Sequence, residues 1–270
     1  MKYSNIRDMH WIRQKKVLKE DFNINLDTSP YTYFKTIIYI ELSAILVFFL
    51  QKTFLTPNFI TLIYALLGVC GGILIGSAQS ELVLVGVLIF FFKSVIDWSD
   101  GLLARIRKKT SELGTLLDEW AGFVGYYSFI IGFGLYLYNT TNENHFLYLI
   151  LIIFSLRVLD LKVFFYISCI LKVTEKNFSI FKKKIINKKK KKKTESKSIF
   201  LYLIKNCLDD RSRTIDLISF LILLDTFYKE IFILNYIFYA FIAKSIIIYF
   251  GNFYKIFFKN YISNLILKTK

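Results

Sequence analysis

Three aspartates, Asp97, Asp100 and Asp118, are the residues of this chain whose type and spacing are best suited to chemistry. Asp97 and Asp100 are three residues apart, so on a helix they share one face. Both lie at the end of one apolar run. A short basic turn follows, and Asp118 lies at the start of the next apolar run. Ionisable side chains at the edge of a bilayer are costly and are usually functional. Carboxylates converging from two neighbouring helices predict a divalent-cation site made of oxygen ligands.

The residues around these aspartates form a spaced pattern, D-x2-D-G-x2-A-R-x8-G-x3-D. It is met by Asp97, Asp100, Gly101, Ala104, Arg105, Gly114 and Asp118. The pattern resembles the signature of the CDP-alcohol phosphotransferase (CDP-alcohol phosphatidyltransferase) family, which makes phospholipids. The triplet Thr56-Pro57-Asn58, which precedes the first clear apolar span, also resembles this family.

The resemblance implies a transferase that moves a phosphoalcohol or phosphatidyl group from a CDP-linked donor to the hydroxyl of an acceptor alcohol and releases CMP. The donor would be CDP-diacylglycerol or a CDP-alcohol, and the protein would be a homodimer. The three aspartates would hold Mg²⁺ or Mn²⁺, and Arg105 would face phosphate. Gly101, Ala104 and Gly114 would leave room for nucleotide, and Ser111 would contact it. Small residues can equally serve helix packing in a membrane.

Gly122 stands where the family pattern has a fourth aspartate, one helical turn after Asp118. The resemblance implies that this aspartate completes a second metal position and deprotonates the attacking hydroxyl, and glycine does neither. Asp118 remains the catalytic candidate within the motif, and Asp160, Asp216 or Asp225 could supply a base from another span. The alternative is a catalytically silent relative that binds nucleotide or lipid as a scaffold.

Long apolar runs alternate with short polar ones along the 270 residues, 55% of which are hydrophobic. This composition predicts an all-α fold, a polytopic bundle of about six transmembrane helices. The expected spans are 59–77, 81–103, 113–138, 146–168, 214–228 and 231–250. Acidic residues inside such spans would also suit a small transporter or channel.

Residues 1–55 form a basic N-terminal region, and residues 56–270 form the transmembrane domain. The segment 6–22 is basic and amphipathic, which predicts either a helix lying on an anionic membrane face or a solvated helix. The segment 36–50 is apolar, but it carries Glu41 and is shorter than the roughly 20 residues of a span. We expect an interfacial or partly embedded helix there, with a true span as the alternative.

A formal net charge of +16 indicates an anionic partner, such as a lipid surface or a phosphorylated substrate. Much of this charge lies in the lysine-rich connection 171–213. Nucleic-acid binding is not expected, because no aromatic platform accompanies the lysines. The positive-inside bias places this connection and the basic turn after Asp100 in the cytoplasm, so the active site of an integral, multi-pass protein would face that side. His10 and His145 lie in segments that look exposed and are not expected to be ligands.

Overall fold

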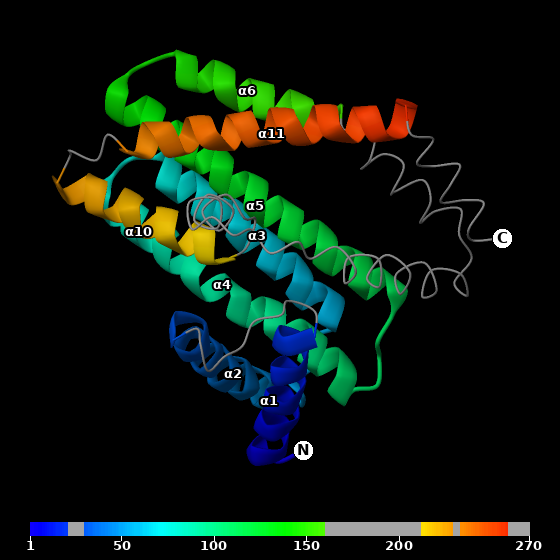
Figure 1. Ribbon diagram of the computed structural model, residues 1–270. Helices are drawn as coiled ribbons and strands as arrows, with labels where there is room; N and C mark the ends of the chain where they lie inside the picture. Colours follow the sequence, from blue (N-terminus) through cyan, green and yellow to red (C-terminus); the bar gives the residue numbers. More distant parts are fainter. Residues whose placement is uncertain (21–29, 160–211, 229–232, 259–270) are drawn as a thin grey trace. The chain divides into compact units, whose positions relative to one another are not determined.

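The computed structural model describes residues 1–20, 30–159, 212–228 and 233–258 of the chain. Its helices are α1 (Tyr3–Glu20), α2 (Pro30–Leu50), α3 (Pro57–Gly76), α4 (Ser80–Ile106), α5 (Glu112–Thr141), α6 (His145–Val158), α10 (Ser212–Tyr228) and α11 (Ile233–Phe258) (Figure 1). No strand occurs in the described ranges, which confirms the predicted all-α class. The chain divides into two compact units, Met1–Gly132 and Phe133–Lys270, and α5 contributes to both.

Five helical segments of the described residues are long and apolar enough to cross a membrane. They are Tyr33–Leu50, Pro57–Gly76, Ser80–Ile106, Leu113–Thr141 and Ile233–Tyr254. The last four correspond to the predicted spans 59–77, 81–103, 113–138 and 231–250. These helices confirm the prediction of a polytopic helical membrane protein.

Two predicted spans are not among these five segments of the described residues. The span 146–168 begins as α6, whose apolar part is His145–Leu156, and the end of that span lies outside the described residues. The span 214–228 is α10, a helix of 17 residues. A crossing takes about 20 residues, so the described part of α10 is shorter than a typical span, and the residues on either side of it lie outside the described ranges. Most of the lysine-rich connection 171–213 also lies outside the described residues.

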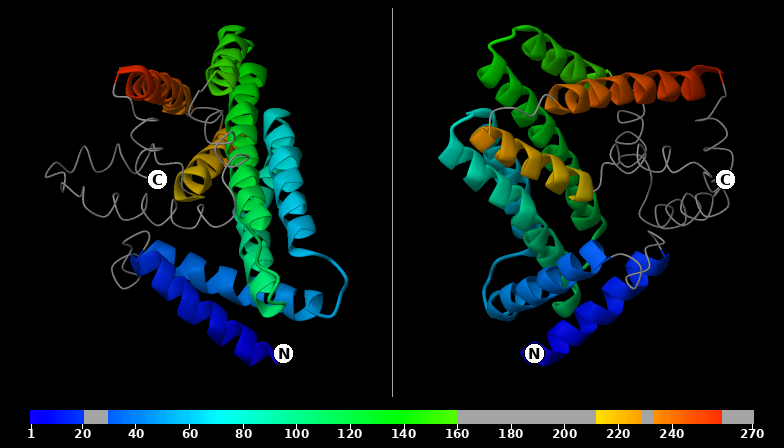
Figure 2. Two further views of the ribbon diagram at one scale, coloured as in Figure 1. Left: turned by 90° about the vertical axis from the view of Figure 1, so that its right-hand side faces the viewer. Right: turned by 60° about the vertical axis from the view of Figure 1, so that its left-hand side comes forward.

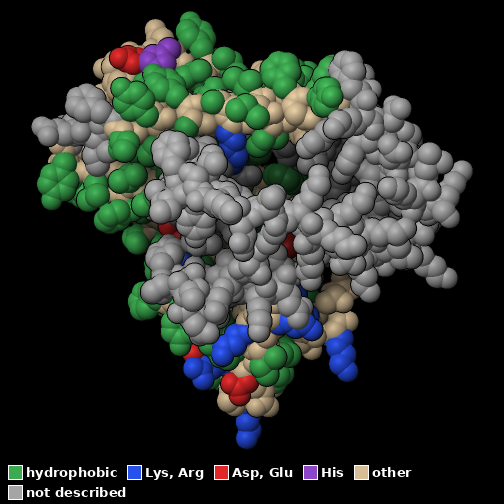
Figure 3. All heavy atoms as spheres, in the orientation of Figure 1, with side chains coloured by type: hydrophobic (Ala, Val, Ile, Leu, Met, Phe, Trp, Pro, Cys, Tyr) green, Lys and Arg blue, Asp and Glu red, His purple; other side chains and the backbone are tan. Residues whose placement is uncertain are grey.

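Large apolar side chains point outward from the long helices. On α4 they include Leu84, Val85, Leu88 and Phe92, each more than two-fifths exposed. In Figure 3, apolar side chains likewise cover α6 and α11, whereas Lys and Arg side chains gather around α1. Large exposed apolar side chains on long apolar helices are unfavourable in water and are satisfied by lipid. The protein is therefore integral to a membrane.

Glycines bring the backbones of α3 and α5 into direct contact within the first unit. A Cβ placed on Gly68 would lie 2.8 Å from the Cα of Gly125, and one placed on Gly132 would lie 2.8 Å from the Cα of Gly72. Gly86 of α4 approaches α3 in the same way. Small residues allow this close approach, which is a common basis of helix packing in membranes. The glycines thus set the spacing of α3, α4 and α5, and the last two of these helices carry the aspartates.

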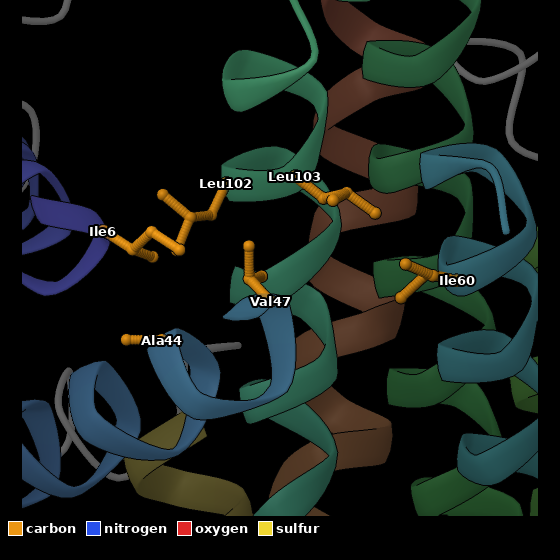
Figure 4. Packing of buried hydrophobic residues seen from close by; sticks show 6 residues of the cluster. All are labelled: Ile6, Ala44, Val47, Ile60, Leu102 and Leu103. Atoms are coloured by element: carbon orange, nitrogen blue, oxygen red, sulfur yellow. The ribbon is translucent and has the colours of Figure 1, made fainter. Parts of the chain in front are cut away.

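Helices α1 and α2 run together obliquely across the ends of α3 and α5, where those two helices begin and α4 ends (Figure 2). A cluster of buried apolar residues joins them to α3 and α4. It consists of Ile6, Ala44, Val47, Ile60, Leu102 and Leu103 (Figure 4). The oblique course agrees with the expected interfacial or partly embedded placement of 36–50, although its length and composition also suit a span.

Glu41 is the acidic residue inside the apolar sequence of α2, and α1 explains its presence there. Its carboxylate accepts hydrogen bonds from the Tyr3 hydroxyl and from the Arg7 guanidinium, each at 2.5 Å. A carboxylate near lipid is costly unless it is paired. The hydrogen bonds of Glu41 thus connect α1 to α2. The sequence of α2 alone does not reveal them, because both donors lie on α1.

Arg107 fastens the connection between α2 and α3 to the end of α4. Its guanidinium donates hydrogen bonds to the carbonyl oxygens of Leu50 and Thr53, each at 2.6 Å, and to that of Leu55. Carbonyls at the end of a helix have no partner within the helix, and the planar fork of Arg can satisfy several of them. Arg107 is therefore a structural residue of this connection.

The second unit packs the end of α5 with α6, α10 and α11. Its core is aromatic and includes Phe133, Tyr136, Phe146 and Phe238, all buried. The Tyr136 hydroxyl donates to the Asp225 carboxylate of α10 at 2.8 Å. Asp225, which the sequence suggested as a replacement base, is therefore held by a tyrosine of its own unit.

Candidate functional site

Helices α4 and α5 position the three motif aspartates. Asp97 and Asp100 lie toward the end of α4, and Asp118 lies in the second turn of α5. The side chains of Asp97 and Asp118 are hydrogen-bonded to each other, and the charge of Asp100 acts on both. The structure thus brings Asp97 and Asp118 into contact, and Asp100 lies near enough for its charge to act on them.

Asp100 is the most enclosed of the three, with 6% of its surface exposed. The Thr61 hydroxyl of α3 donates a hydrogen bond to its Oδ2, and the neighbouring N–H of Gly101 donates to the same carboxylate. Hydrogen bonds to an ionised group are stronger than those between neutral groups. They fix the orientation of Asp100, whereas Asp118 is exposed.

The aspartates suit a divalent cation by their chemistry. In the described part of the chain, no three His, Cys, Asp or Glu side chains are gathered closely enough to surround a metal ion. Asp97 and Asp118 are nevertheless in contact, which two carboxyl groups maintain only by sharing a proton or a cation. Oxygen donors on two packed helices are the ligands that Mg²⁺ and Mn²⁺ prefer. The donor set therefore fits such an ion.

Arg105 lies in the last turn of α4, with Asp100 and the exposed Arg13 of α1 close enough for their charges to act on it. A Cβ on Gly101 would lie 3.2 Å from its guanidinium NH1, so the missing side chain at Gly101 leaves room for it. Among the described residues, nothing accepts a hydrogen bond from its buried Nε. An unsatisfied guanidinium beside another Arg is suited to an anion such as phosphate. The half-buried Ala104 precedes it.

A polar cavity of about 540 Å³ lies beside the basic turn between α4 and α5. Its polar lining consists of Thr53, Thr56, Asn58, Arg107, Lys109 and Ser111. The cavity thus joins the Thr56-Pro57-Asn58 triplet to the turn that contains Ser111. Its size and its mixed polar and basic walls are suited to part of a nucleotide.

Ser111 and Gly114 have structural roles at this cavity as well. The Ser111 Oγ accepts a hydrogen bond from the Gly114 N–H at 3.0 Å, so Ser111 caps the start of α5. A Cβ on Gly114 would lie 3.3 Å from the Asn58 side chain, which places Asn58 directly against this glycine. Thr56 in turn caps α3, because its side chain accepts from the Phe59 N–H at 3.3 Å. Two helix caps thus face the cavity.

Gly122 borders open space. A Cβ added there would meet no atom of the described residues within 4 Å, although Gly122 lies one turn after Asp118 on α5. The position therefore has room for a larger side chain. Of the acids suggested as a replacement base, Asp160 lies outside the described residues, and Asp216 and Asp225 belong to the second unit.

Two residues of the site escaped the sequence analysis. Thr61 binds Asp100, and Lys93 lies within hydrogen-bond distance of the Tyr64 hydroxyl, at 3.3 Å, and acts on Asp97 with its charge. The sequence could have identified Lys93 as a candidate, because it is the single charged residue between Glu81 and Asp97. Thr61 could not be identified in this way, because its partner depends on how α3 packs against α4.

His10 was expected to be exposed, and this expectation is wrong. Its side chain is fully buried, with its ring 5.6 Å from that of Trp98, the neighbour of Asp97. Its Nδ1 lies 3.5 Å from the Ser43 hydroxyl. Burial, reinforced by the positive charges of Arg105 and Arg13, lowers the pKa of His10 to about 4. The docking of α1 on α2 causes this burial, and the pattern of α1 alone does not reveal it.

Comparison with known proteins relates the chain to a protein family. A family model described as CDP-alcohol phosphatidyltransferase matches residues 54–224, which is more than half of the chain. No curated protein is similar enough to count as a match. The matched range starts just before α3 and contains all the motif residues, whereas α1 and α2 precede it.

Proposed function

The chain belongs to the CDP-alcohol phosphatidyltransferase family, and on this premise we propose that it is a phosphotransferase of phospholipid biosynthesis. It would move a phosphoalcohol or phosphatidyl group from a CDP-linked donor to an acceptor hydroxyl. The observation that carries this proposal is the contact of Asp97 with Asp118 beside the fixed Asp100. Acidic side chains that meet across two membrane-spanning helices are expected where a charged donor is bound at a membrane.

The reaction requires neutralisation of the donor pyrophosphate. Asp97, Asp100 and Asp118 would hold Mg²⁺ or Mn²⁺, which when bound supplies positive charge to the phosphate oxygens. Arg105 would bind a phosphate oxygen through its unsatisfied guanidinium. The cavity that includes Asn58 would take the nucleotide part of the donor.

The transfer step forms a bond from the acceptor oxygen to phosphorus and breaks the phosphorus–oxygen bond to CMP, which leaves with the bridging oxygen. The acceptor loses its hydroxyl proton during this step. Asp118 is our candidate to receive the proton, because its carboxylate is exposed while Asp100 is enclosed. A positioned base typically contributes roughly 10²–10⁴-fold to such a step.

A second candidate function is a catalytically silent relative that binds nucleotide or lipid without turnover. The observation that favours it is Gly122, which offers no carboxylate and has no neighbour within 4 Å of an added Cβ. This form would retain metal-dependent CDP binding, because the three aspartates and Arg105 are present.

Purified protein in detergent tests both candidates. With Mn²⁺ and CDP-diacylglycerol or a CDP-alcohol, the enzyme releases CMP with at least one acceptor from a panel of glycerol phosphate, inositol phosphate, serine and amino alcohols. Asp100→Asn removes this release, and the control Asp8→Asn, at an exposed site on α1, does not. CDP binding without CMP release supports the silent relative, and the absence of both contradicts both candidates.

A further inference from the structure

Lys93 is a buried cation in the interior of the first unit. It lies on α4 one helical turn before Asp97, and only 6% of its surface is exposed. A lysine in a span usually extends its ammonium toward the membrane surface. Here the ammonium instead lies against two other helices, so its position in the site requires an explanation.

Two helices enclose this ammonium group. Its Nζ is 3.3 Å from the Tyr64 hydroxyl of α3 and 4.4 Å from the centre of the Tyr64 ring. On α5, a Cβ added to Gly125 would lie 2.3 Å from the same Nζ. Glycine at 125 and tyrosine at 64 thus form a compartment that fits one ammonium group. The charge is held in place, because an ammonium so enclosed has little freedom to move.

The enclosed charge lies beside the aspartates, and it acts directly on Asp97. The three carboxylates and the Lys93 ammonium together carry a net charge of two negatives, which a single divalent ion neutralises. Arg105, whose charge acts on Asp100, adds a further positive charge that also opposes a second ion. A second divalent ion would meet both the first ion and the Lys93 ammonium. In a partly buried site, repulsion between like charges is strong.

We propose that Lys93 is a fixed positive charge of the site, so that the three aspartates bind one divalent cation and not two. This inference rests on the proposed function, because it takes Asp97, Asp100 and Asp118 as the cation ligands. Lys93 is a positioning residue, since it acts through Asp97 and need not touch the substrate. The charge of Lys93 limits the number of divalent ions that the site binds and lowers its affinity for them.

Mn²⁺ titration of the purified full chain, followed by the electron paramagnetic resonance signal of free Mn²⁺, tests the inference without measuring activity. The unaltered protein binds one Mn²⁺ per chain. Lys93→Met and Lys93→Gln both lower the Kd for Mn²⁺ by roughly tenfold or more, because a repulsive charge is removed from the site. The glutamine variant keeps a polar group near Tyr64, so the pair separates the effect of charge from that of polarity.

Lys35→Met is the matched control. Lys35 is also 6% exposed and lies over two aromatic rings, Tyr39 and Phe91, on the α2 side of the same unit. This variant removes a buried cation and leaves the Kd for Mn²⁺ unchanged. Size-exclusion profiles of the variants verify that each one is folded.

Three results overturn the inference. The first is that the unaltered protein binds two Mn²⁺ ions per chain. The second is that the Lys93 variants have the same Kd for Mn²⁺ as Lys35→Met. The third is that Lys93→Met lowers the Kd for Mn²⁺ and Lys93→Gln does not. Each leaves the proposed transferase in place if CMP is still released. If no Mn²⁺ binds at all, the inference fails, and the CMP assay decides separately on the proposed function.

Discussion

Asp100 owes its orientation to Thr61, and this single hydrogen bond is testable. Thr61→Val removes the hydroxyl and keeps the shape of the side chain, so the buried carboxylate loses a charge-assisted bond. Such a bond contributes about 1.5–3 kcal/mol, so CMP release should fall by roughly 10- to 100-fold. Ser99→Ala is the control, because the Ser99 hydroxyl is buried next to Asp100 but donates to the Val95 carbonyl at 2.6 Å. Equal losses in both variants would contradict the role of Thr61.

The buried His10 predicts a pH dependence of the docking of α1. The pKa of His10 is lowered from 6.5 to about 4, so between these values the undocked form takes up a proton that the docked form excludes. Docking is therefore at full strength above pH 6.5 and weakens as the pH falls toward 4, by about 3 kcal/mol in total. Below pH 4 both forms are protonated, and the loss ceases.

Hydrogen exchange of the α1 amides between pH 7.5 and 4.5 measures this loss as a fall in protection factors. His10→Gln should remove the pH dependence. His145→Gln should leave it unchanged, because His145 is more exposed and belongs to the second unit. A pH dependence that persists in His10→Gln would assign the effect to another group.

Gly122 separates the two candidate functions. A carboxylate at this position would lie one turn from Asp118 in open space, so Gly122→Asp should raise CMP release by roughly tenfold or more if a positioned base limits turnover. Gly251→Asp is the matched control, because a Cβ on Gly251 of α11 also meets nothing within 4 Å. No CMP release from Gly122→Asp would favour the silent relative.

At the scale of elements, the glycines of α3 and α5 determine how closely the helices approach. A Cβ on Gly72 would lie 2.3 Å from the Ser128 carbonyl oxygen, and backbone atoms cannot move aside as a side chain can. Gly72→Ala should therefore lower the free energy of unfolding by about 1–3 kcal/mol, measured by denaturant unfolding in detergent micelles. Gly122→Ala, which meets open space, should leave it unchanged or raise it by up to about 1 kcal/mol.

The sequence predicts elements better than it predicts their partners. Apolar length was enough to locate α3, α4, α5 and α11, because lipid requires a run of about 20 apolar residues. The proximity of Asp97 to Asp118 also followed, since their helices are consecutive. The bond between Thr61 and Asp100 did not, because it depends on a close contact of α3 with α4 through Gly86. The Glu41 partners likewise lie on a separate helix, α1.

At the scale of the whole molecule, the family match leaves the first two helices out, but the structure makes them part of the site's surroundings. Residues 54–224 match the family, whereas His10 and Arg13 lie on α1. The His10 ring lies against the Trp98 ring of α4, and the charge of Arg13 acts on Arg105 of α4. The N-terminal helices therefore contribute to the environment of the motif, and a protein without them would present Arg105 differently.

Membrane orientation is a prediction for the entire chain. The positive-inside bias places the turn around Lys109 in the cytoplasm, and α5 crosses the membrane before the turn around Asn144. In a variant without its native cysteines, an impermeant maleimide should label Asn144→Cys in intact cells. It should label Lys109→Cys only after permeabilisation. The reverse pattern would place the aspartates on the opposite side of the membrane.

The glycine contacts between α3 and α5 also restrict the route by which a substrate arrives. Where two backbones touch, no acyl chain can pass between them, so this seam is closed to lipid. A donor dissolved in the bilayer must reach the aspartates along another side of α4 or α5. A covalent link that ties α3 to α5 along this seam, away from Lys93, should accordingly leave turnover intact, because the two helices need not separate there.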